Sequence, residues 1–98
     1  MSIALNAMKF NRHIDPGHSW FEVPYDLIVD LGIENRISSC SYRQLGTCYL
    51  EEDCDAPLFI DAWMKHYGES EFPVESVRHD YWNSPECFVR ELPSYYTD

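Results

Sequence analysis

The chain has 98 residues, with 17 acidic and 7 basic side chains and a formal net charge of -10. That length accommodates one domain, and a hydrophobic fraction of 45% is too high for a disordered acidic tail. The charge excludes the phosphates of nucleic acid and anionic membrane surfaces as direct ligands, because there is no stripe of basic residues to neutralise them. We therefore expect basic protein surfaces as partners.

The N-terminal part of the chain contains a Pro16-Gly17 turn signal followed by an apolar run over residues 20–23. This pattern predicts a flexible arm over residues 1–18 and a single domain over residues 19–98 that begins with a strand. No basic start typical of a signal peptide is present, and no run approaches the roughly 20 apolar residues that cross a bilayer. We therefore expect a cytoplasmic protein with reduced cysteines.

The segment after this strand has helical spacing. Apolar residues recur at positions 27, 28 and 31, whereas Asp26 and Asp30 fall on the opposite side. Pro24 suits the first turn of a helix and Gly32 suits its end. The sequence predicts a short helix over residues 24–31 with an acidic outer stripe.

From residue 37 the apolar period changes to two, on both sides of a turn at residues 44–46. Cys40 and Tyr42 precede this turn, and Cys48 and Leu50 follow it at alternate positions. The pattern predicts a hairpin whose apolar face carries these four side chains toward the core, with Tyr49 on the exposed face. We therefore expect these two cysteines to be structural.

A second helix is predicted to begin at Asp53 or Asp55, either of which can cap it, and to end at Gly68. Aromatic residues recur every four positions from Phe59 to Tyr67 and indicate its buried face. A further strand is expected over residues 72–79 and a short helix over residues 86–92. The predicted fold class is α+β: a small antiparallel sheet of three or four strands, two main helices packed on one face, and a short C-terminal helix.

Catalytic, metal-binding and cofactor-binding signatures are weak. A calcium loop that began at Asp53 would need glycine and glutamate where Leu58 and Met64 stand. The cysteines lack the close Cys-x-x-Cys spacing of zinc sites. We therefore expect no metal, no cofactor and no catalytic residues.

A small Cys/His-dependent enzyme remains an alternative. Cys54 and Cys87 lie near predicted helix starts, where the helix dipole lowers a thiol pKa, and Cys87 is near His79 or His66 as a possible base. This alternative predicts a concave pocket that gathers one of these cysteines with a histidine.

Several stretches carry a resemblance to known sequences. They are residues 17–23 (GHSWFEV), 31–33 (LGI), 37–39 (ISS) with Ser41 and Tyr42, and 49–56 (YLEEDCDA). Together they resemble small uncharacterised proteins of phages and other mobile elements, over roughly the first two thirds of the chain. The resemblance implies a phage-like or plasmid-like origin, and no known activity.

We expect a phage-type binding or inhibitor protein whose acidic surface engages a basic, nucleic-acid-handling protein in the host cell cytosol. By analogy this is an anti-CRISPR or similar anti-defence role, in which the protein occludes a nucleic-acid channel or mimics its phosphates, and the partner is a host CRISPR-Cas or other defence complex. A structural or homo-oligomeric phage accessory protein, such as a homodimer, is the alternative. The predicted contact residues are Glu51, Glu52, Asp53, Asp55, Asp26, Asp30, Tyr49 and Trp82.

Overall fold

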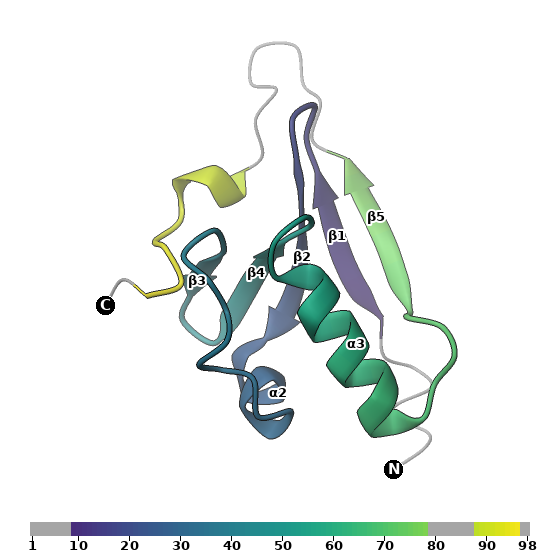
Figure 1. Cartoon of the computed structure of the whole chain (residues 1–98). Helices are drawn as coiled ribbons and strands as arrows, with labels where there is room; N and C mark the ends of the chain where they lie inside the picture. Colours follow the sequence, from purple (N-terminus) through teal and green to yellow (C-terminus); the bar gives the residue numbers. More distant parts are fainter. Residues whose placement is uncertain (1–8, 79–87, 97–98) are drawn as a thin grey trace.

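A computed structural model describes residues 9–78 and 88–96, and these contain a five-stranded sheet (Figure 1). The strands are β1 (Phe10–Ile14), β2 (Ser19–Pro24), β3 (Tyr42–Gln44), β4 (Thr47–Glu51) and β5 (Val74–Arg78). Their order across the sheet is β3-β4-β2-β1-β5. Neighbouring strands pair antiparallel except β1 and β5, which run parallel, so the sheet is mixed.

One helix of three turns packs on this sheet. It is α3 (Ala56–Tyr67), and it ends at Gly68, whose φ of 66° lies in the left-handed region that glycine adopts without strain. Asp61 and Lys65 form an ion pair of 3.4 Å on its outer side. The predicted helix up to Gly68 is therefore confirmed.

Two shorter helical segments complete the described fold. The helix α2 (Tyr25–Asp30) follows β2 directly and buries Leu27 and Ile28. Asp26 and Asp30 are exposed, as the predicted acidic stripe requires. The 3₁₀ helix η1 (Phe88–Glu91) lies near the C-terminus and is yellow in Figure 1.

The main core lies between the sheet and the α2 and α3 helices, and α3 crosses in front of the sheet in Figure 1. Burial of apolar side chains from both layers supplies the main driving force for folding. The buried members are Phe10, Val23, Leu27, Ile28, Ile33, Ile37, Cys48, Leu50, Ala56, Phe59, Trp63 and Tyr95.

The opposite face of the sheet is partly covered as well. Val89 of η1 packs there against Trp20 of β2 and Tyr49 of β4. Because side chains alternate along a strand, Cys48 and Leu50 point to the main core while Tyr49 points to this second cluster. Tyr49 is consequently only 9% exposed, and its predicted place on an exposed face is wrong.

The predicted fold class is wrong in its strand number, sheet type and helix arrangement. Over residues 9–78 and 88–96 the sheet has five strands and is mixed, and α3 is the one helix there of more than six residues. The extra strand is β1, which lies within the predicted flexible arm over residues 1–18. It forms because Phe10 is buried against Phe59 and Trp63 of α3, a contact that local pattern does not reveal.

The predicted hairpin is confirmed as β3 and β4, with Cys48 and Leu50 buried. The prediction is wrong for Cys40 and Tyr42. Cys40 precedes β3 and is exposed, and Tyr42 lies opposite Tyr49 and packs against the second cluster, not the main core. The predicted strand near residues 72–79 corresponds to β5. Within the described residues, no helix is long and apolar enough to cross a membrane.

Candidate functional site

A hollow of about 420 Å³ lies where β2 begins and β4 ends. The strands contribute its floor, the turn after β4 and the loop before β3 contribute one wall, and η1 contributes an arginine. The lining residues are His18, Trp20, Cys40, Tyr42, Glu51, Asp53, Cys54 and Arg90. Thiols, an imidazole, carboxylates and a guanidinium therefore meet in one concavity.

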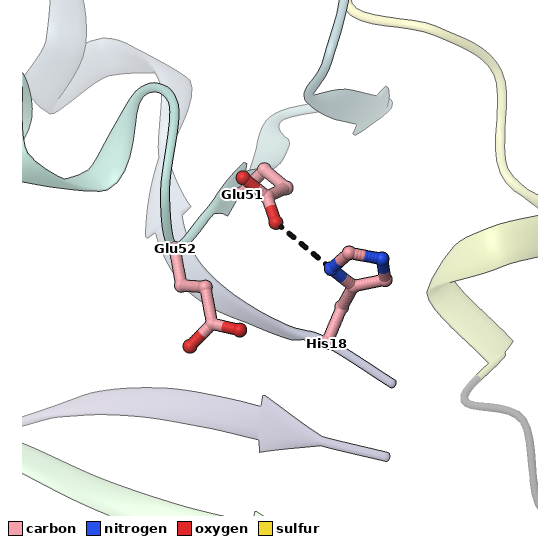
Figure 2. Close-up of side chains that lie close together, drawn as sticks. All are labelled: His18, Glu51 and Glu52. Carbon is pink, nitrogen blue, oxygen red and sulfur yellow. Dashed lines mark ion pairs between the residues drawn. The ribbon is translucent and has the colours of Figure 1, made fainter. Parts of the chain in front are cut away.

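His18 and Glu51 form an ion pair within this hollow, with 3.2 Å between Nδ1 and Oε2, and Figure 2 shows the two side chains directed at each other. The other carboxylate oxygen of Glu51 accepts hydrogen bonds from the backbone N–H groups of Asp53 at 2.8 Å and Cys54 at 3.0 Å. These two bonds fix the carboxylate, so Glu51 stabilises the turn that leads from β4 into α3.

Glu52 belongs to a different set of contacts. Its Oε1 accepts hydrogen bonds from Ser19 Oγ at 2.7 Å and from the Arg12 guanidinium at 3.0 Å. The hydrogen bond from Ser19, followed by that from Arg12 and its positive charge, lowers the pKa of the Glu52 carboxyl. Glu52 thus connects the end of β4 to β1 and β2.

His18, Glu51 and Glu52 bring three groups that can ligate a metal within 4.8 Å of one another (Figure 2). Imidazole and carboxylate ligands suit divalent cations such as zinc. However, Arg12 and Ser19 already bind the Glu52 carboxylate, and a cation would have to compete with the guanidinium for it. These three side chains are therefore explained as parts of an ion-pair network that stabilises the ends of the strands.

Asp55 is the N-cap residue of α3, but its side chain does not cap the helix. The carboxylate instead accepts hydrogen bonds from Ser38 N at 3.0 Å, Ser38 Oγ at 2.8 Å and Ser41 Oγ. Asp55 is 3% exposed and Ser41 is fully buried. The predicted capping role of this side chain is wrong, because its actual role is to hold the loop before β3 against the start of α3.

The two exposed cysteines of the hollow lie side by side. Cys54 Sγ is 2.8 Å from Cys40 Sγ, although the residues are 14 positions apart. The hydrogen bond to Cys40, together with the negative charges of Glu51 and Asp55, raises the pKa of the Cys54 thiol to about 11. Cys54 is therefore protonated at neutral pH.

This chemistry argues against the Cys/His enzyme alternative, even though the hollow does gather Cys54 and His18. A nucleophilic cysteine needs a lowered pKa and a base within reach. Here the pKa of Cys54 is raised, and within the described residues its sulfur hydrogen-bonds Cys40 and no histidine. Cys87 and His79 lie outside the described residues.

The structure separates the predicted contact residues. Asp26, Asp30 and Asp53 are exposed, Glu51 and Glu52 are half-buried in ion pairs, and Asp55 and Tyr49 are buried. Trp82 lies outside the described residues. The run of acids from residue 51 to 55 therefore does not form one exposed surface, because successive side chains leave the strand end in different directions.

Sequence reasoning missed most of the hollow. Glu51, Asp53 and Cys54 were already candidates from the sequence, but nothing in it placed them beside His18 or Cys40. Arg90 reaches the hollow from a segment much later in the chain, and no local pattern indicates that contact. Comparison with protein-family models, curated proteins and solved structures found no match.

Proposed function

We propose that this protein binds a basic surface of another protein through an acidic face centred on α2. Eight acidic residues are exposed within the described part of the chain, against four basic residues. The exposed acids are Asp26, Asp30, Asp53, Asp61, Glu69, Glu71, Glu75 and Glu91, and the exposed bases are Lys9, Arg36, Lys65 and Arg78. Such an excess steers association with positively charged partners.

The arrangement of charge on α2 carries the proposal. Asp26 and Asp30 are four residues apart on one helix face, where like charges destabilise the helix. Asp30 also lies at the helix C-terminus, where a negative charge is unfavourable and where no basic residue compensates it. Neither carboxylate forms an ion pair within the described residues. Asp26 complements the helix dipole because it lies in the first turn, whereas Asp30 does not serve the stability of α2. The unfavourable charge at Asp30, repelled further by Asp26, supports a role in binding.

Val29 adds an apolar element to the same face. It is 41% exposed and lies between the two aspartates in the sequence. An apolar side chain flanked by charges suits a contact surface, in which the apolar group is desolvated and the charges at the rim guide the encounter. We define this surface, Asp26, Val29 and Asp30, as the α2 face.

The proposed partner is a basic protein that handles nucleic acid, such as a CRISPR-Cas or other defence complex of a host cell, and the proposed place of action is the host cytosol. The resemblance to proteins of phages and mobile elements supports this choice of partner. The acidic surface supports inhibition by occupying sites where phosphates would bind. A structural or homo-oligomeric accessory protein is the alternative.

Replacing Asp26 and Asp30 together with lysine tests the proposal. Affinity capture from host cytosol with the wild-type protein, followed by mass spectrometry, identifies the partner, and the purified pair is then measured directly. We expect the double variant to weaken binding at least about tenfold, mainly through slower association. Its thermal stability should stay close to that of the wild type, because one like-charge pair replaces another at two exposed positions, and the change opposes the helix dipole at residue 26 but favours it at residue 30.

The matched control replaces Glu69 and Glu71 with lysine, which makes the same change in net charge at exposed positions outside the α2 face. Binding through that face predicts a clearly smaller loss for this control. Equal losses in both variants would show that only net charge matters. Size measurement at two salt concentrations distinguishes the alternative, since a homo-oligomer forms without any second protein.

A further inference from the structure

Cys40 and Cys54 are placed for a covalent reaction with each other. Their sulfur atoms are 2.8 Å apart, and a disulfide needs a separation of about 2.05 Å, so a shift of roughly 0.8 Å would suffice. Both side chains are exposed, so a reagent in solution has access to them. The third described cysteine, Cys48, is fully buried in the main core.

The backbone on each side of the pair is held by contacts that do not involve sulfur. The N–H of Cys40 donates to Ser38 Oγ at 3.1 Å, and the N–H of Cys54 donates to Glu51 Oε1 at 3.0 Å. Asp55 then joins the two segments, because its carboxylate binds Ser38 and Ser41 across the gap. The fold itself therefore brings the thiols together, and a bond between them requires only the short further approach of the two sulfurs.

We propose that Cys40 and Cys54 are a redox-active pair that forms an intramolecular disulfide by exchange with a small disulfide such as oxidised glutathione. One cysteine loses its proton to solvent, attacks a glutathione sulfur and expels one glutathione thiolate. The second cysteine then loses its proton, attacks the mixed disulfide and expels the other glutathione. The two protein sulfurs lose two electrons, and one oxidised glutathione becomes two reduced glutathiones.

The surroundings of the pair determine its behaviour. The attacking species is the thiolate, and the hydrogen bond to Cys40, together with the nearby acids, raises the pKa of Cys54 and keeps its thiolate scarce at neutral pH. Attack by Cys54 is therefore slow at pH 7, and its rate should rise about tenfold per pH unit up to pH 9. The protein thus does not stabilise the thiolate of Cys54, in contrast to oxidoreductases that do so.

The disulfide would change the hollow directly, since both sulfurs line it. In the reduced protein they offer two thiol groups to the cavity. In the oxidised protein they form a covalent link between the loop before β3 and the turn before α3. The pair is thus a modification site that alters the wall of the hollow without altering the core.

The test equilibrates the reduced full-length protein with mixtures of oxidised and reduced glutathione at pH 8. Samples are quenched with acid, free thiols are alkylated, and the masses of the intact protein and its peptides are measured. We expect loss of two of the four thiols and a peptide that joins Cys40 to Cys54. The Cys87→Ser variant is the matched control and should form the same link. A link that requires Cys87, or mixed disulfides without a link, would overturn the proposal.

Single variants and unfolding make the test specific to the folded geometry. Cys40→Ser and Cys54→Ser should each abolish the link and leave one glutathione adduct. In guanidinium chloride the pair is joined only by a flexible chain, so its effective concentration falls to the millimolar range. We expect the equilibrium constant for disulfide formation to be at least about tenfold larger in the folded protein. A smaller ratio would show that the fold does not favour the bond, and the proposal would be wrong.

Discussion

Replacing Asp55 with alanine is expected to be among the most damaging single changes at the hollow. The carboxylate is 3% exposed and accepts three hydrogen bonds, from Ser38 N, Ser38 Oγ and Ser41 Oγ. Alanine removes all three and leaves the buried Ser41 hydroxyl without this partner. Hydrogen bonds to a charged group contribute about 1.5–3 kcal/mol each, and a buried donor left unpaired costs about 1–3 kcal/mol.

These contributions are coupled, because one carboxylate serves both serines, so they do not simply add. We expect the free energy of unfolding to fall by about 3–5 kcal/mol, which is a large part of the roughly 5–15 kcal/mol that stabilises a domain. For a domain of this size the corresponding fall in Tm is about 12 °C or more. Asp55→Asn keeps one acceptor oxygen and should lose less.

The assay is urea unfolding followed by the fluorescence of the tryptophans, of which Trp20 and Trp63 are buried. Asp53→Ala is the matched control, since Asp53 is exposed two residues away and should change stability by at most about 0.5 kcal/mol. If the free energy of unfolding of Asp55→Ala fell by less than about 1 kcal/mol, the buried carboxylate would not hold the loop before β3 in place. A similar loss in Asp53→Ala would point to a general effect of charge.

Two further predictions follow from burial and charge. Cys48→Ser should destabilise the protein by about 1–3 kcal/mol, because it places a hydroxyl in the core. Cys40→Ser should cost less than about 0.5 kcal/mol, because Cys40 is exposed. Urea unfolding compares the two variants, and equal losses of stability would contradict the burial of Cys48 alone. The pKa of Glu52 is lowered in the folded protein, so its ionised carboxylate stabilises the fold at neutral pH. This stabilisation is lost as the pH falls from the ordinary pKa of 4.5 through the lower pKa of the folded state. The difference in Tm between the wild type and Glu52→Gln should therefore shrink below about pH 4.5, and a constant difference would refute this reasoning.

The local elements with a clear period could be predicted from the sequence. The helix that ends at Gly68 carries aromatic residues every four positions, and the hairpin with Cys48 and Leu50 alternates on both sides of its turn. The exposed position of Asp26 and Asp30 also follows from helical spacing. In each case the signal lies within one element, so a short window contains it.

The sheet itself could not be predicted in the same way. Strand β1 pairs with both β2 and β5, and Phe10 packs on residues about 50 positions later in the chain. The burial of Tyr49 depends on Val89, which returns to cover the second face of the sheet. Such pairings depend on which distant segments meet, and a local pattern contains no information about them.

The candidate site shows the same division. The sequence by itself determined that the chain is strongly acidic and that a dense run of carboxylates follows β4. Tertiary structure alone decided what those carboxylates do, because it placed Arg12, His18 and the Ser38–Ser41 segment within hydrogen-bonding distance of three of them. It also brought Cys40 beside Cys54. A run of acidic residues in a sequence suggests an exposed surface, but folding can bury such a residue against a partner. Which partner it meets depends on how segments far apart in the chain pack together.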